Sequence, residues 1–98
     1  MREAELEKAC IELAEKSGFM VFRPSKFWSK NNGRRKNDLG APDLFIFHDG
    51  VATAVELKVG SGVQSGDQLA FEARLYQAGI KYFVVKTLDE FGAILEDL

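Results

Sequence analysis

Two short apolar runs on either side of a tight-turn signal constrain this chain more than any other feature. Leu44–Phe47 and Val51–Val55 flank Asp49-Gly50, a dipeptide that favours the two-residue turn of a β-hairpin. Asp43 stands just before the first run, and Glu56 follows the second. The sequence therefore predicts a hairpin that carries two carboxylates on neighbouring strands.

Charged residues at the end of such a strand are unusual. Side chains alternate between the two faces of a strand, so Glu56 and Lys58 share one face while Leu57 points to the other. Charges at the end of a buried strand are costly unless they are paired or hold a metal. We therefore expect Asp43 and Glu56 to hold a metal ion, with the backbone carbonyl of Leu57 as a further candidate ligand.

This set of side chains suits the hydrolysis of a phosphodiester bond. Mg²⁺ prefers oxygen ligands and typically binds one or two carboxylates while it keeps several waters. A bound metal ion of this kind acts as a Lewis acid, activates water and positions the substrate. Lys58, beside Glu56, would orient or deprotonate the attacking water and stabilise the negative charge on the pentavalent phosphorus.

The rest of the chain predicts one small α/β domain. The expected elements are a helix at 3–17, strands at 19–23, 43–48 and 51–59, a helix at 65–78, a strand at 81–86 and a last helix from 87. The strands on either side of the 65–78 helix can pair in parallel only through a right-handed crossover. We therefore expect a mixed sheet, in which an antiparallel meander is joined by one parallel strand.

Capping signals mark the starts of the two later helices. Ser65-x-x-Gln68 and Thr87-x-x-Glu90 both have the form of a capping box. The inner face of the 65–78 helix is predicted from its apolar and small side chains, which are Leu69, Ala73, Leu75 and Tyr76.

Acidic residues crowd the start of the first helix. At about 100° per residue, Glu3 projects close to the centre of the apolar stripe, Glu7 nearer to its edge and Glu5 well outside it. Acids favour a helix N-terminus through the helix dipole, which accounts for Glu5. The dipole does not explain why Glu3 would face inward.

Positive charge is concentrated in one segment. Between Ser17 and Asn37 there are six basic residues and no acid, which leaves 7 of the 13 Lys and Arg residues against 15 acids elsewhere. A local basic block on an acidic protein indicates a defined contact with a polyanion. Phe27 and Trp28 in this segment suit stacking on nucleic-acid bases, or alternatively pack on the core beneath a solvated loop. The predicted contacts are Arg23, Lys26, Trp28, Lys30, Arg34, Arg35 and Lys36.

Composition excludes several classes of protein. A hydrophobic fraction of 46% in 98 residues is typical of one folded domain. No run approaches the roughly 18 apolar residues of a membrane span, and the charged start of the chain is unlike a signal peptide. The single Cys10 rules out an internal disulfide framework, fits a reducing cytoplasm and is expected to be a core residue.

Several of these features together resemble a known nuclease signature. Pro42-Asp43 and Glu56-Leu57-Lys58 match the pattern of the PD-(D/E)XK superfamily, and residues 1–98 are similar over nearly their whole length to a stand-alone VRR-NUC domain. The narrower resemblance also rests on Gly40-Ala41-Pro42-Asp43, on Ser65-x-x-Gln68 and on the turn at Gly79. It implies a restriction-endonuclease-like α/β core of order α-β-β-β-α-β-α, with a central mixed sheet flanked by helices.

The resemblance also implies roles for individual residues. The hairpin acids would bind Mg²⁺ or Mn²⁺, and Lys58 would be the catalytic lysine. A first-helix glutamate would complete the acidic cluster: the family's Glu-x-x-x-Gln pattern favours Glu3, whereas alignment with archaeal junction resolvases favours Glu7. Gln68 either hydrogen-bonds near the metal-bound water or the lysine, or is a capping residue only.

The function that the resemblance implies is structure-selective cleavage of branched DNA such as Holliday junctions, in repair or recombination. Similar proteins act as dimers, and eight Phe residues offer apolar surface for a homodimer interface. The expected location is the cytoplasm of a bacterium or a phage-infected cell, with no membrane partner. Two alternatives stay open: a less selective endonuclease or nickase, and a DNA-binding module without chemistry. The intact Asp43, Glu56 and Lys58 argue against the second.

Overall fold

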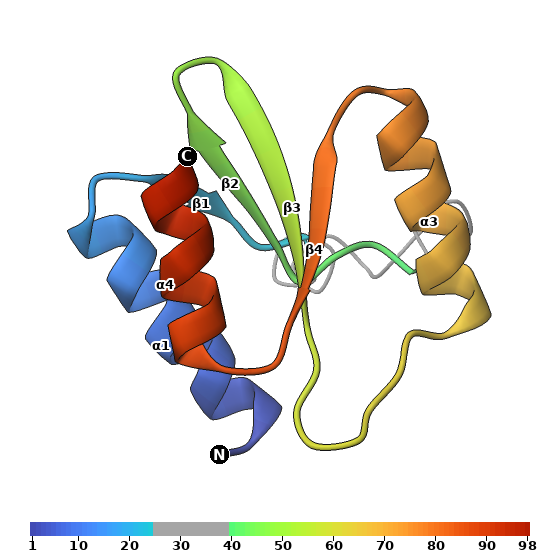
Figure 1. Cartoon of the computed structure of the whole chain (residues 1–98), viewed down its shortest axis with the longest axis horizontal. Coiled ribbons are helices and arrows are strands. Elements are labelled where there is room, and N and C mark those ends of the chain that lie inside the picture. The colour runs from blue at the N-terminus through green and yellow to red at the C-terminus, as the bar shows by residue number, and fades with distance from the viewer. Residues whose placement is uncertain (25–39) are drawn as a thin grey trace.

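The computed structural model describes residues 1–24 and 40–98 of the chain. These residues form, in chain order, α1 (Glu3–Lys16), β1 (Met20–Phe22), β2 (Leu44–His48), β3 (Val51–Leu57), α3 (Gly66–Gln77), β4 (Lys81–Val85) and α4 (Leu88–Asp97), as Figure 1 shows. Within the described ranges the predicted succession of helices and strands is confirmed, and each bound that was predicted lies within two residues of its expected position.

The strands form one mixed sheet in the order β1-β2-β3-β4. β2 pairs antiparallel with β1 and with β3, whereas β4 runs parallel to β3 and is reached through α3. Asp49 and Gly50 have φ angles of 49° and 78°, as expected for a type I′ hairpin turn. Leu44 faces Val55 in the resulting register, so Asp43 and Glu56 lie at the same end of the hairpin.

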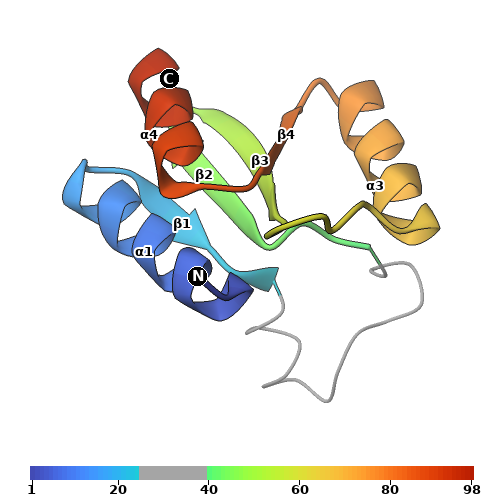
Figure 2. The same ribbon diagram turned by 60° about the horizontal axis from the view of Figure 1, so that its bottom comes forward.

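Helices cover both faces of the sheet. α1 and α4 lie side by side on one face, and α3 lies against β4 on the other (Figures 1 and 2). Because strand side chains alternate, one set of strand residues packs under the α1 and α4 pair. The buried residues of this main core are Leu6, Cys10, Ala14, Leu44, Ile46, Val55, Leu57, Val85, Phe91 and Leu95. Cys10 is thus the core residue that the sequence predicts.

α3 is held by a smaller core. Ala54 and Tyr82 from the sheet are buried beneath it together with Leu75, which is the one buried residue within the helix. The partly buried side chains around them are Phe45, Phe71 and Ile80. Apolar packing therefore holds mainly the C-terminal half of α3.

The predicted inner face of α3 is wrong at three of its four positions. Leu69 and Tyr76 are 52% and 58% exposed, and Ala73 is exposed as well. The side that turns to the sheet carries Gln68 and Glu72, which are half-buried. Apolar spacing misled the prediction because two of the inward positions are polar and are held by hydrogen bonds.

The start of α4 confirms only half of the predicted second capping box. The Thr87 hydroxyl accepts a hydrogen bond from the Glu90 backbone N–H at 3.1 Å, as an N-cap should. The Glu90 carboxylate accepts from the Lys86 N–H at 2.9 Å, one residue before the expected donor.

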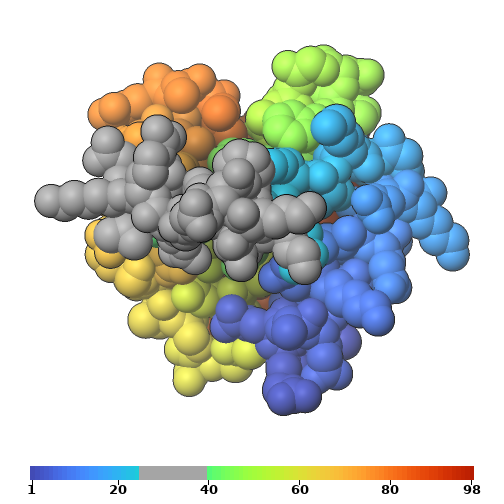
Figure 3. Space-filling view, turned by 180° about the vertical axis from the view of Figure 1, so that it is seen from behind, coloured from blue at the N-terminus to red at the C-terminus, as the bar shows by residue number. Residues whose placement is uncertain are grey.

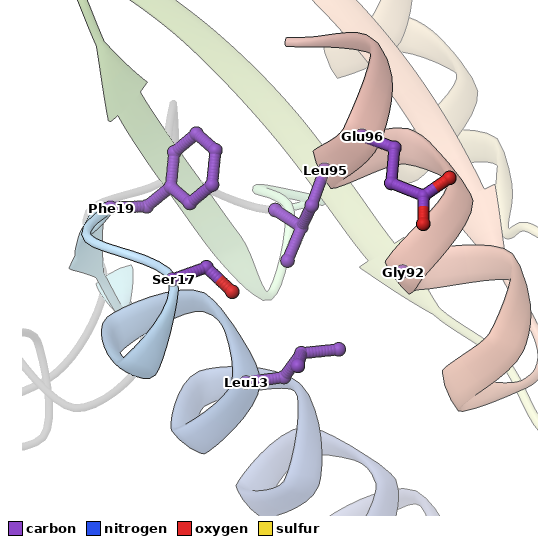
Figure 4. Close-up of a pocket in the computed structure, with 6 residues that line it drawn as sticks. All are labelled: Leu13, Ser17, Phe19, Gly92, Leu95 and Glu96. Carbon is purple, nitrogen blue, oxygen red and sulfur yellow. The ribbon is translucent and has the colours of Figure 1, made fainter.

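A hollow of about 350 Å³ lies between the end of α1, the start of β1 and α4 (Figure 4). It is lined by Leu13, Ser17, Phe19, Gly92, Leu95 and Glu96, so none of the predicted site residues contributes to it. No helix in the described ranges is long and apolar enough to cross a membrane.

Candidate active site

Asp43, Glu56 and Lys58 lie at the C-terminal end of β3, and the segment that follows them passes beside the N-terminal end of α1. Figure 3 shows the start of the chain, in dark blue, next to this later segment, in yellow. Asp43 directly precedes β2, and its Oδ2 accepts a hydrogen bond from the Leu57 backbone N–H at 2.8 Å. This bond extends the hydrogen bonding between β2 and β3 beyond their last backbone pair, Leu44 and Val55. It also fixes the Asp43 carboxyl against the end of β3.

Glu56 is the most deeply buried charged residue of the described chain, with 3% of its surface exposed. Its Oε2 accepts a hydrogen bond from Gln68 Nε2 at 2.9 Å and lies 3.8 Å from Lys58 Nζ. Its Oε1 is buried without any N–H or O–H donor among the described residues. A buried carboxylate oxygen left in this state is costly, so this position suits a cation or a further hydrogen-bond donor.

Burial is the main reason why the pKa of Glu56 is raised, from its ordinary 4.5 to about 8. The nearby Asp43 charge raises it further, whereas Lys58 acts in the opposite direction. Burial also raises the pKa of Asp43, although the Leu57 N–H bond lowers it. The two carboxyl groups are close enough to share a proton. Such a shared proton would give Glu56 Oε1 a hydrogen-bond partner only while one of the two groups is protonated.

The site fits a hard divalent cation. Two adjacent carboxylates and one unpartnered buried oxygen are the donor set that Mg²⁺ or Mn²⁺ requires. The N–H and C=O of one strand residue point to the same side, so the Leu57 carbonyl shares the side on which its N–H meets Asp43. Asp43, Glu56 and the Leu57 carbonyl therefore suit the metal-binding role predicted for them.

Gln68 combines the two interpretations that the sequence left open. Its Oε1 accepts from the Ser65 N–H at 2.9 Å, and its N–H donates to Ser65 Oγ at 3.2 Å, so the capping box is present. The same side chain donates through Nε2 to Glu56. The view that Gln68 only caps the helix is therefore wrong. Its side chain bonds near the lysine, as the other view expects, because the Glu56 Oε2 that accepts from it lies 3.8 Å from Lys58 Nζ.

Gly40 lets the segment before Asp43 approach α3 closely. Its φ is +82°, and a Cβ at this position would overlap the Asp67 carbonyl group and the Gln68 backbone nitrogen. A side chain here would push the start of α3 away from the hairpin. The Gly-Ala-Pro-Asp sequence thus links the position of Asp43 to that of Gln68.

The two first-helix candidates, Glu3 and Glu7, lie in different surroundings. Glu3 is exposed, so the expected inward direction is wrong: burial in α1 begins at Leu6, after the first turn. Its charge nevertheless raises the pKa of Asp43 and of Glu56, which places it near the pair. Glu7 is half-buried and raises the pKa of Asp43. Within residues 1–24 and 40–98, no three acidic, His or Cys side chains gather closely enough to hold a metal together.

Arg23, predicted to contact DNA, forms an ion pair with Glu7 of the same chain. Its Nη2 lies 2.6 Å and its Nε 2.7 Å from Glu7 Oε1, and the Arg23 side chain is 40% exposed. This ion pair neutralises Glu7 beside the site. The other predicted contacts lie outside the described residues, and they are Lys26, Trp28, Lys30, Arg34, Arg35 and Lys36.

Sequence reasoning missed a set of polar residues next to Gln68. Gln64 donates hydrogen bonds to Glu72 and to Tyr82, and no motif or charge pattern singles these residues out. The inward spacing of Gln68 and Glu72, one helical turn apart, was the available signal.

Comparison with known proteins supports the fold and the nuclease resemblance. No family model and no curated protein matches the chain. A solved structure described as a VRR_NUC domain superposes with a TM-score of 0.74 and 28% sequence identity, over 96% of this chain and 94% of that one. This likeness over nearly the whole chain supports the predicted resemblance to a VRR-NUC domain. Its mixed four-stranded sheet between helices is the restriction-endonuclease-like fold expected for a VRR-NUC domain.

Proposed function

We propose that this domain is a divalent-metal-dependent DNA endonuclease. The observation that carries the proposal is the buried, unpartnered Glu56 Oε1 beside Asp43, with Lys58 Nζ 3.8 Å from the other Glu56 oxygen. The nuclease family of the similar solved structure supports the same reaction class. A cytoplasmic location is proposed with it.

Each residue of the site has a distinct task in this proposal. Asp43 and Glu56 would hold Mg²⁺ or Mn²⁺ together with the Leu57 carbonyl, and either Glu3 or Glu7 would supply further negative charge. When bound, the ion polarises the phosphate and makes a water molecule more acidic. Lys58, with 16% of its side chain exposed, would orient the attacking water and balance the phosphate charge. Gln68 occupies Glu56 Oε2, which leaves Oε1 free for the metal.

Branched DNA, such as a Holliday junction, is the proposed substrate, and a homodimer is the proposed active form. Cutting both strands of a symmetric junction calls for two sites. Met20 and Phe47 face each other across β1 and β2 and are 69% and 38% exposed, which provides apolar surface for association. A monomer mass from light scattering at micromolar concentration would contradict the dimer.

Cleavage assays test the proposed activity. Four-way junctions, flaps and linear duplex are incubated with wild type, Lys58→Ala and Asp43→Asn in Mg²⁺, Mn²⁺ or Ca²⁺. Lys58→Ala is expected to lose about 10²- to 10⁴-fold in rate, the usual range for a group that assists proton transfer. Lys81→Ala is the matched control, because Lys81 is exposed on β4.

The outcomes separate the candidate functions. Faster cleavage of junctions than of linear duplex supports the proposed selectivity, and equal rates indicate a less selective endonuclease or nickase. If wild type leaves every substrate intact but binds DNA, the domain is a binding module. A Lys58→Ala variant with wild-type rates would refute the assigned mechanism.

A further inference from the structure

Gln64 connects three elements next to the candidate active site. It lies in the segment between β3 and α3, and its Nε2 donates to Glu72 Oε1 on α3 and to the Tyr82 hydroxyl on β4, both at 3.2 Å. Tyr82 is 5% exposed, and Gln64 and Glu72 are half-buried. One side chain therefore joins the loop, the helix and the sheet in a largely buried setting.

This cluster runs beside the bond between Gln68 and Glu56. Glu72 follows Gln68 by four residues, so both lie on the same side of α3. Tyr82 pairs with Ala54, two residues before Glu56, so Tyr82 and Glu56 share one face of the sheet. Burial and then the Glu56 charge raise the pKa of Tyr82, in keeping with a hydroxyl close to the site.

The N-terminal half of α3 depends on such polar contacts. The one buried residue of α3 is Leu75, which lies beyond Glu72 toward the C-terminal end of the helix. The apolar cluster around Leu75 therefore leaves the first turn, which carries Gln68, without buried apolar side chains. A small rotation of α3 about this cluster would move Gln68 away from Glu56.

We propose that Gln64, Glu72 and Tyr82 are positioning residues that hold α3 so that Gln68 stays bonded to Glu56. None of the three is assigned a contact with substrate or metal. The catalytic consequence rests on the proposed nuclease function, because it assumes that an oriented Glu56 binds the metal.

A direct test follows the Gln68 side-chain amide by NMR in the metal-free protein. Tyr82→Phe removes the hydroxyl that accepts from Gln64, and Tyr76→Phe is the matched control, because Tyr76 is the other tyrosine of the chain and is 58% exposed. The Gln68 amide signals are expected to shift or broaden in Tyr82→Phe and to stay in place in Tyr76→Phe. Unchanged signals in folded Tyr82→Phe would overturn the proposal.

A second pair of variants avoids the buried strand. Glu72→Gln keeps a carbonyl oxygen that can accept from Gln64, whereas Glu72→Leu does not. The proposal expects wild-type Gln68 signals in Glu72→Gln and altered signals in Glu72→Leu. Equal behaviour of the two variants would refute a role for the hydrogen bond.

Activity then tests the link through Gln68. At saturating Mn²⁺ and DNA, Tyr82→Phe is expected to lower the cleavage rate about fivefold, the factor that one neutral hydrogen bond typically contributes. In a Gln68→Ala background the same substitution should change the rate less than twofold, because the residue it positions is gone. A fivefold loss in both backgrounds would overturn the proposal. If wild type cleaves no DNA, the proposed function fails while the NMR result still decides this inference.

Discussion

The Glu56→Gln substitution offers a quantitative test of the site without DNA. In the folded, metal-free protein Glu56 keeps its proton up to about pH 8, whereas in the unfolded chain it releases it near its ordinary 4.5. Between these values unfolding releases a proton, so the free energy of unfolding falls as the pH rises. Glutamine stays neutral throughout and removes this dependence.

The size of the effect follows from the two pKa values. Each pH unit between 4.5 and about 8 contributes about 1.4 kcal/mol, which sets a ceiling of about 5 kcal/mol for Glu56. The neighbouring Asp43 shares the same proton, so the two carboxyl groups do not add. The lost contact with Lys58, at 3.8 Å, reduces the gain. We expect Glu56→Gln to be about 2 to 4 kcal/mol more stable than wild type at pH 8.5 and about equal to it at pH 5.

Urea denaturation followed by circular dichroism, in EDTA at pH 5, 7 and 8.5, provides the measurement. Glu15→Gln is the control, because Glu15 is exposed near the end of α1 and its loss should leave the wild-type pH dependence intact. Mn²⁺ should then stabilise wild type at pH 8.5 but not Glu56→Gln. Parallel pH profiles for wild type and Glu56→Gln would show that Glu56 is not a strained buried acid, and the argument for a metal at this position would lose its basis.

Three further predictions concern the surroundings of the site. In urea denaturation, Gly40→Ala should lower the free energy of unfolding by at least about 2 kcal/mol more than Gly79→Ala does. Both glycines have a positive φ, but only a Cβ at Gly40 would meet the α3 backbone. Equal losses in the two variants would argue against close packing at Gly40. Arg23→Gln should lower the free energy of unfolding by about 1 kcal/mol or less, since the pair of Arg23 with Glu7 is partly exposed. The substitution frees the Glu7 carboxylate, so the Mn²⁺ affinity measured by calorimetry should rise. An unchanged affinity would show that Glu7 does not contribute to metal binding. Cys10, fully buried with its pKa raised by burial to about 11, should resist iodoacetamide at pH 8 in the folded protein and react in urea, as mass spectrometry would show; rapid alkylation of folded protein would contradict its core position.

The fold and the central acids were predictable because local signals agreed with one another. The Asp49-Gly50 turn fixed the register, and the register placed Asp43 beside Glu56 without any knowledge of the rest of the chain. The Ser65 capping box and the turn at Gly79 bounded α3 correctly. In each case the information lay within about fifteen residues of sequence.

The errors arose where contacts between distant elements decided the outcome. Glu3 lies on the apolar side of the helical wheel, but the first turn of α1 extends past the hydrophobic core, so Glu3 stays exposed. Charge patterning also could not specify that Arg23 pairs with Glu7, sixteen residues away in sequence, while its contact with DNA stays a prediction. On α3 the inward positions are polar, and a search for apolar periodicity therefore selected Leu69 and Tyr76 on the outer side.

The bond from the Leu57 N–H to Asp43 makes one carboxylate both a part of the sheet and a part of the site. An Asp43→Ala variant would leave this N–H without its acceptor, at a cost of about 1 to 3 kcal/mol, so its inactivity would mix a frayed strand with a missing ligand. Asparagine retains an oxygen acceptor. Asp43→Asn is therefore the better choice for trapping uncleaved complexes. By the same logic, a descendant of this domain that abandoned chemistry should still keep an acceptor side chain at this position.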